Sequence, residues 1–282
     1  MKKMLTIVLA LMLCVISCTA FATEAEPTGK LKEILDKGVI VVGTDAAWAP
    51  FEYIGADGEI EGADIALAKY IAEQLNVELK LENIAFDNIP TYIANDEVDI
   101  SLSAWTITEE RKESMYFSVP YTVAQQYIIV NDDVDAVKTI EDLAGMNIGV
   151  HLGTTGDFLI SDEIMLDTGV LYNTGANVQQ YKFLTDAALA LKNGELGAIV
   201  CDTLLAENLV AVNGGLKCFP LTYADGSANI EELGVAMKVG EDDLLAKINE
   251  IIQPVIDDGT VDKWIVEYTQ KASELPTEEE AE

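Results

Sequence analysis

The stretch VDISLSAWTITEER, residues 98–111, joins a predicted strand to the only arginine in the chain. Residues 98–102 predict a strand, and the polar segment after them ends at Arg111. Thr106 and Thr108 can cap the turn that follows the strand, or they can offer a hydroxyl and a backbone N–H to a bound anion. The stretch therefore predicts either a structural cap or an anion site directly after a strand.

Arginine is used once in a chain that otherwise carries its positive charge on lysine. The planar guanidinium can hold a carboxylate through two parallel hydrogen bonds, which an ammonium group cannot do. Arg111 is therefore a candidate for gripping the carboxylate of a ligand. From composition alone, a surface position or a structural ion pair would explain a single arginine equally well.

Outward from this stretch, strands alternate with helices. The chain has 282 residues, half of them apolar, which is enough for one large core or two moderate domains. The alternation predicts α/β layers with largely parallel sheets. Strands are expected at residues 39–43, 77–81, 98–102, 127–130, 147–150, 198–201 and 233–239, and helices at 64–75, 89–93, 139–143, 185–191 and 244–257.

Two other segments follow predicted strands with groups suited to a small charged ligand. The loop GTTG, residues 153–156, would expose amide donors at a helix N-terminus, where Thr154 and Thr155 could meet a carboxylate. It lacks the Walker lysine and the spacing of a dinucleotide fingerprint, so it does not support nucleotide binding. Asp202 ends the strand 198–201 and would face the crevice of an open sheet, where it could pair with an ammonium group. Its alternative role is a helix N-cap.

Aromatic residues and the single histidine complete the candidates. Trp48, Phe51, Tyr53 and Phe86 could wall an apolar slot, although aromatic residues more often belong to the core. His151 has no partner histidine and no Cys or carboxylate spacing typical of a zinc site, and the chain has no nucleophile elbow. The sequence therefore predicts no metal, no cofactor and no catalytic centre.

Charge and the terminal segments limit the partners and the compartment. A formal net charge of −32 disfavours nucleic acid and anionic lipid surfaces. Residues 1–22 predict a signal peptide, and the alternative is cleavage after residue 17 with a lipidated Cys18. No later segment predicts a membrane span. Cys201 and Cys218 could form one bridge or remain buried thiols, and residues 276–282 form an acidic tail.

Four blocks of sequence, in this order, resemble the family 3 periplasmic amino-acid-binding proteins of ABC transporters. The resemblance covers roughly residues 30–270, and the block from 103 to 121 is its most specific part. The blocks are GTDAAWAPFEY (43–53) with GEIEGADIALAKYIAEQL (58–75), SAWTITEERKESMYFSVPY (103–121), IGVHLGTTGDF (148–158) and LKNGELGAIVCD (191–202).

The resemblance implies a two-lobe periplasmic-binding-protein-like fold of type II, with a mostly parallel sheet in each lobe and the ligand cleft between the lobes. Lobe 1 would comprise residues 30–122 and 228–275, and lobe 2 residues 126–224, with hinge motion closing the cleft. The implied partners are a polar amino acid and the membrane permease of an ABC transporter. The protein itself is expected outside the cytoplasm and as a monomer. A dehydratase-type enzyme or a ligand sensor on the same fold remains the alternative.

The resemblance also implies a role for each candidate residue. Arg111 would hold the ligand's α-carboxylate with help from Thr106, Thr154 and Thr155. Asp202 and the carbonyl of Ala104 would pair with the α-ammonium. Trp48 and Phe86 would sandwich the side chain, whose tip would meet Asp45 and His151. This tip environment favours glutamine, arginine, lysine or histidine over glutamate and aspartate, unless Asp45 only caps its loop. His151 and Cys201 depart from the family pattern and put the side-chain preference in doubt.

Overall fold

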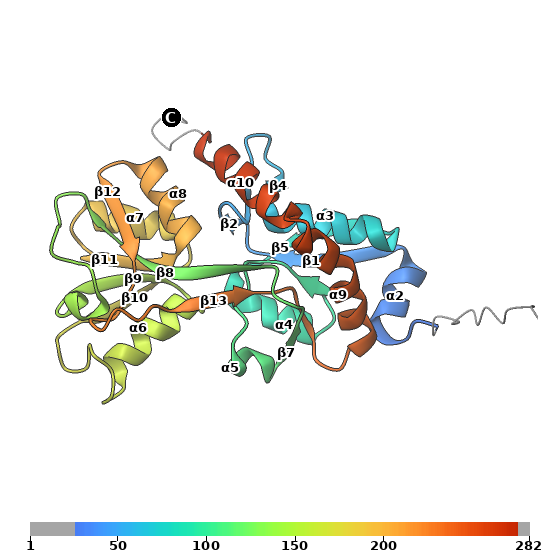
Figure 1. The fold of residues 1–282 in the computed structure, drawn as a ribbon, viewed down its shortest axis with the longest axis horizontal. Coiled ribbons are helices and arrows are strands. Elements are labelled where there is room, and N and C mark those ends of the chain that lie inside the picture. Colours follow the sequence, from blue (N-terminus) through green and yellow to red (C-terminus); the bar gives the residue numbers. More distant parts are fainter. Residues whose placement is uncertain (1–25, 276–282) are drawn as a thin grey trace, which may run out of the picture.

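The computed structural model describes residues 26–275. They form two mixed sheets flanked by helices, which Figure 1 shows as two lobes joined by extended strands. The α/β two-lobe architecture expected from the sequence is confirmed. In each sheet three neighbouring strands pair in parallel, and the other pairs are antiparallel. The predicted signal peptide, the alternative lipidated Cys18 and the acidic tail lie outside the described residues.

The first sheet has the strand order β5-β1-β6-β14-β7. Strands β1 (Val39–Thr44), β5 (Glu78–Asn83) and β6 (Ile100–Ser101) are parallel, and β14 (Ala236–Lys238) runs antiparallel to both β6 and β7 (Met115–Phe117).

Strand β1 is buried on both faces because helices cover both. Ile40 and Val42 belong to the same apolar cluster as helices α2 (Gly29–Lys37), α3 (Ala63–Leu75) and α9 (Asp242–Asp257). Val41 points the other way, toward α4 (Ile89–Ala94). This follows from the two-residue period of a strand, and it explains the continuous β-branched run.

The second sheet repeats this pattern in the order β10-β9-β11-β8-β12. Strands β9 (Asn147–His151), β10 (Asn177–Tyr181) and β11 (Ala198–Asp202) are parallel. Strands β8 (Thr122–Asn131) and β12 (Leu216–Pro220) are antiparallel to their neighbours. The apolar faces of this sheet are covered by α6 (Thr155–Met165), α7 (Leu184–Lys192) and α8 (Thr203–Asn213).

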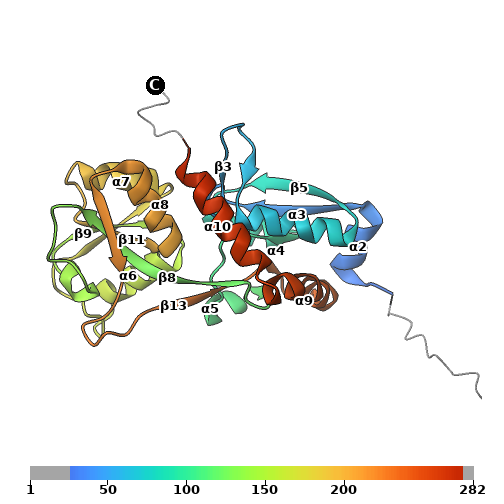
Figure 2. The same ribbon diagram turned by 45° about the horizontal axis from the view of Figure 1, so that its top comes forward.

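Two antiparallel strands connect the lobes. Residues 122–125 of β8 pair with β13 (Ile230–Leu233), and residues 126–131 of the same strand pair with β11 and β12. Figure 1 shows β8 and β13 running side by side between the lobes. Helix α10 (Thr260–Ser273) adds a third link, because it packs on α3 and α8 (Figure 2). The residue limits expected for the lobes stay a prediction.

Smaller elements shape the edges of the cleft. Strands β2 (Ala47–Trp48), β3 (Glu52–Ile54) and β4 (Ile60–Glu61) form an antiparallel sheet. The short helices are η1 (Phe86–Asn88), α5 (Glu109–Lys112) and η2 (Ile140–Leu143). The strand predicted over 233–239 is instead two strands, β13 and β14, because the chain passes from the connection into the first sheet at Gly234. A Cβ on that glycine would lie 2.8 Å from the side chain of Ile107.

Two expectations about the chain concern cysteines and membranes. Cys201 is buried and Cys218 half-buried, and both are free thiols, so the alternative of a bridge between them is wrong. Cys201 lies on β11 and Cys218 on β12, and strand β8 lies between these two strands. Among residues 26–275, no helix has the length and apolar character needed to cross a bilayer.

Candidate functional site

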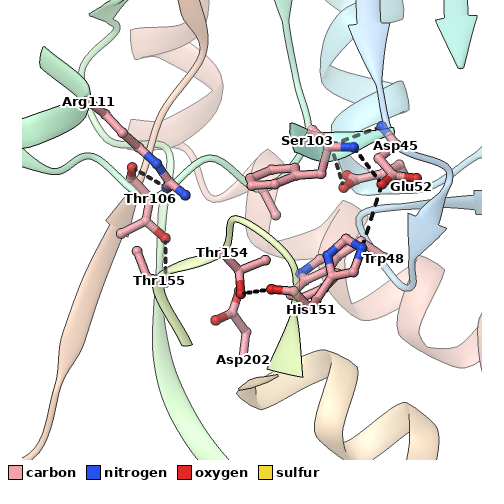
Figure 3. A pocket seen from close by; sticks show the side chains of 12 residues that line it. Asp45, Trp48, Glu52, Ser103, Thr106, Arg111, His151, Thr154, Thr155 and Asp202 are labelled. Carbon is pink, nitrogen blue, oxygen red and sulfur yellow. Dashed lines mark hydrogen bonds and ion pairs between the residues drawn. The ribbon is translucent and has the colours of Figure 1, made fainter. Parts of the chain in front are cut away.

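A cavity lies where the strands of both sheets end. This is the crevice at the carboxyl ends of strands where open α/β sheets bind ligands. Figure 3 shows Arg111, Thr106 and Thr155 at one end and Asp45, Glu52 and Ser103 at the other. The structure brings all ten candidate residues to its wall: Asp45, Trp48, Phe86, Ala104, Thr106, Arg111, His151, Thr154, Thr155 and Asp202.

Arg111 is a buried guanidinium without an ion-pair partner. Its Nη1 donates to the carbonyl of Thr106 at 2.9 Å and its Nη2 to that of Gly153 at 3.1 Å, so it touches both lobes. None of the ion pairs formed within residues 26–275 involves it. Burial lowers its pKa to about 10, which still leaves it charged at neutral pH. A charge held in this way requires an anion.

Aromatic rings fix the position of this guanidinium. Its central carbon lies 4.9 Å from the ring centre of Trp105 and 5.6 Å from that of Phe86. The two rings stack on each other with centroids 4.2 Å apart. Thr108 begins helix α5 as its N-cap, because its hydroxyl accepts the backbone N–H of Arg111 at 3.1 Å. The prediction that Thr108 caps the turn is thus confirmed, and this cap positions Arg111.

Ala104 adopts an unusual backbone conformation at the cavity wall. Its φ is +47°, in the left-handed region that costs a residue with a Cβ roughly 1–2 kcal/mol. The conformation is held because its N–H donates to Asp64 at 2.8 Å, and Tyr121 donates its hydroxyl to the same oxygen at 2.9 Å. Burial raises the pKa of Asp64 to about 6.

Asp202 is buried at the end of β11, and its side chain forms no capping hydrogen bond to the helix α8 that follows. One of its oxygens instead accepts the side-chain amide of Gln126 at 2.5 Å. Burial, and after it the charge of Glu231, raises the pKa of Asp202 to about 7. Asp202 thus holds the N-cap position without a side-chain capping bond, and its carboxyl group lines the cavity.

The two threonines of the GTTG loop do different things. The Thr154 hydroxyl donates to the carbonyl of His151 at 2.8 Å and accepts the N–H of Asp157 at 3.3 Å, so it caps helix α6. The Thr155 hydroxyl instead donates to Glu231 at 2.7 Å. The N–H of Asp157 is thus capped, whereas those of Thr155 and Gly156 have no acceptor within the helix and lie at its positive end.

The opposite end of the cavity is rich in hydrogen-bond acceptors. Asp45 accepts the backbone N–H of Phe86 at 2.9 Å, and its pKa is raised by burial. The Nε2 of His151 lies 2.6 Å from the carbonyl of Lys182 and must carry the proton of that bond, because a carbonyl only accepts. Burial lowers the pKa of His151, and its buried Nδ1 has no partner within residues 26–275. That nitrogen is an acceptor without a donor.

Four polar residues at or beside the cavity were not predicted from the sequence. Glu52 and Ser103 line it, and Gln126 and Glu231 form hydrogen bonds to its lining residues. Glu52 directly follows one of the aromatics already singled out, which was a usable signal. Glu231 lies outside the strand predicted over 233–239, and the pairing of β13 with β8 brings it to the cavity.

Comparisons with known proteins agree with this geometry. The model of the bacterial extracellular solute-binding proteins, family 3, matches residues 40–271. The L-cystine-binding protein TcyJ of Escherichia coli K12 is 28% identical over 253 residues, covering 88% of this chain and 89% of that protein. The holo ArgBP of T. maritima is 36% identical, covers 83% of this chain and 98% of its own, and superposes with a TM-score of 0.72.

A further solved structure touches on the enzyme alternative. It is an ancestral amino-acid-binding protein, AncCDT-1, described as a precursor of cyclohexadienyl dehydratase. It is 30% identical, covers 86% of this chain and 100% of its own, and has a TM-score of 0.75. The resemblance inferred from the four sequence blocks is confirmed by these matches. The chain belongs to the bacterial extracellular solute-binding proteins, family 3.

Proposed function

We propose that the protein captures a polar amino acid outside the cytoplasm, with arginine the first candidate, and delivers it to an ABC permease. The observation that carries this proposal is the buried Arg111 guanidinium, which has two of its five N–H groups on carbonyls and no carboxylate partner among the described residues. An amino acid's α-carboxylate supplies the missing anion. Asp202 supplies the matching negative charge for its α-ammonium.

The side-chain end supports a ligand tip that donates hydrogen bonds. Asp45, Glu52 and the unpartnered Nδ1 of His151 all offer acceptors there. An anionic tip would bring a carboxylate against Asp45, which is unfavourable in a buried site. A guanidinium, an amide or an ammonium fits, and the arginine-binding protein from T. maritima favours the guanidinium.

Calorimetric titration with the twenty amino acids tests the proposal. We expect arginine, glutamine, lysine or histidine to bind most tightly and glutamate and aspartate to bind at least tenfold more weakly. Asp45→Ala should reduce the preference for a cationic tip. Asp57→Ala is the control, because Asp57 is exposed and lies outside this cavity. Failure of every amino acid to bind would refute the function, and unchanged preference in Asp45→Ala would make that residue structural.

The remaining parts of the proposal concern catalysis, export and delivery. We expect a binding protein that does not turn over substrate, so incubation with prephenate should yield no dehydrated product.

We also propose export through residues 1–22, or anchoring through a lipidated Cys18. Labelling of cells with radioactive palmitate separates the two, because Cys18→Ser would abolish labelling only in the anchored form. Cross-linking to a permease in intact cells tests delivery.

A further inference from the structure

We propose that Glu231 is a positioning residue that makes the site demand an α-ammonium group, an inference that rests on the proposed amino-acid binding. Glu231 lies on β13, one of the two strands between the lobes, and only 5% of it is exposed. Neither the motif blocks nor any residue role inferred from the sequence includes it.

Its carboxylate bridges the two lobes through the two cavity threonines. One oxygen accepts the hydroxyl of Thr106 at 2.7 Å and that of Thr155 at 2.7 Å. The other oxygen accepts the side-chain amides of Gln126 at 3.2 Å and Asn229 at 3.0 Å. Four donors therefore surround one carboxylate and occupy its acceptor capacity.

The consequence follows from counting protons. A threonine hydroxyl has one hydrogen, and in both residues that hydrogen points at Glu231. Only oxygen lone pairs on the two hydroxyls therefore remain for other partners. Thr106 and Thr155 consequently present acceptors, not donors, to the cavity they line.

These acceptors stand with a third one, the Asp202 carboxyl, which is linked to Glu231 through the same Gln126 amide. An α-ammonium carries three N–H donors and no acceptor, so it complements this set. A hydroxy acid or an oxo acid would place oxygen lone pairs against the same atoms. Burying an unmatched polar group is costly, so the site would reject such analogues.

Glu231→Gln tests this role, because the amide has nearly the same shape but must direct its NH₂ at donors on one side. Glu232→Gln is the matched control, since Glu232 is the next residue of β13 and exposed. The probes are L-arginine with 5-guanidinopentanoate, which lacks the α-amino group, and L-glutamine with glutaramate. Calorimetry, with displacement at millimolar concentration for weak ligands, measures each pair.

We expect Glu231→Gln to reduce the preference for the amino acid over its des-amino analogue about tenfold or more. Glu232→Gln should keep the wild-type preference. If Glu231→Gln weakens the binding of both ligands equally, Glu231 only connects the two lobes, and the inference is overturned. An unchanged preference for the amino acid over its des-amino analogue would also overturn the inference. The same holds if arginine binds more weakly and 5-guanidinopentanoate still shows no detectable binding. If the wild-type protein binds no amino acid, the proposed function fails and this inference fails with it.

Discussion

At the scale of single residues, the site depends on two buried charges of opposite sign that are not paired with each other. Arg111 donates to two carbonyls, and Asp202 accepts from a neutral amide. Buried charges are stable only when their partners are well placed, so an incoming zwitterion completes both at once. The affinity of the protein should therefore be sensitive to the geometry and protonation of these two groups.

Replacing Arg111 by lysine should weaken amino-acid binding at least tenfold while leaving the fold intact. Lysine keeps the charge but cannot hold a carboxylate and two carbonyls with one planar group, and it loses the stacking on Trp105. Calorimetry measures the affinity, and circular dichroism checks the fold. Unchanged affinity in a folded variant would remove Arg111 from the carboxylate site.

Binding should weaken as the pH falls below 7. The pKa of Asp202 is raised from 3.8 to about 7, so the empty site is increasingly protonated below that value. The raised pKa makes the ligand-free protein relatively more stable as the pH falls from about 7 towards 4, whereas the ligand's ammonium prefers the ionised form. Between about pH 7 and 5 the dissociation constant should rise up to about tenfold per pH unit, with a proton released on binding.

Titrations at several pH values, in buffers of different ionisation enthalpy, measure both effects. Asp202→Asn separates this group from His151, whose pKa burial lowers from the ordinary value of an imidazole. The variant should bind more weakly and lose most of the pH dependence. A wild-type affinity that is constant from pH 5 to 8 would contradict the assignment.

At the scale of elements, helix starts and strand ends place the ligand-facing groups. Helix α5 begins at a threonine cap that positions Arg111, and α6 begins at Thr154 directly beside the cavity. The connecting strands β8 and β13 supply Gln126 and Glu231 from the middle of the molecule. The elements that hold the lobes together therefore also form part of the site.

Thr154→Ala should destabilise the protein by about 1 kcal/mol, because helix α6 loses its N-cap. For a chain of this size, that corresponds to a fall in Tm of about 2–4 °C. Thr154→Ser retains the hydroxyl and serves as the control. Thermal unfolding followed by circular dichroism provides the measurement, and equal stability of the alanine variant and the wild type would show that the cap does not matter.

At the scale of the whole molecule, the proposed ligand would lie between two lobes that hydrogen bonds connect at the cavity. Arg111 bonds to Gly153 across the cleft, and Glu231 holds one threonine from each lobe. Helix α10 spans the lobes on another side. Binding between the lobes should therefore stabilise the entire fold and not one lobe alone.

Adding ligand at about one hundred times its dissociation constant should stabilise the protein by about 2.7 kcal/mol. The expected rise in Tm is roughly 5–10 °C for a protein of this size. Arg111→Lys at the same ligand concentration should show a smaller rise. A tight ligand that leaves Tm unchanged would mean that binding is not coupled to the folded arrangement of the lobes.

Local sequence predicted the central elements of both sheets and many of the site residues. The β-branched run of β1 and the apolar spacing of α3 identify a buried strand and a helix, because burial repeats with the period of the element. Polar residues directly after strands pointed to Thr106, Thr154, Thr155 and Asp202, since strand ends in such sheets meet at one crevice. The elements that were not predicted include helices α2, α8 and α10 and strands β10 and β12. Strand β10 is polar and lies at a sheet edge, so it has no continuous apolar pattern.

Tertiary structure alone decided the hydrogen-bond network that gives these residues their roles. The approach of Glu231 to Thr106 and Thr155 joins residues 125 and 76 positions apart, and nothing in the local sequence of β13 encodes it. The same holds for the raised pKa of Asp202, which follows from burial and from a carboxylate on another strand. Sequence patterns record which face of an element is buried, whereas charge, protonation and hydroxyl direction depend on groups that only the folded chain brings together.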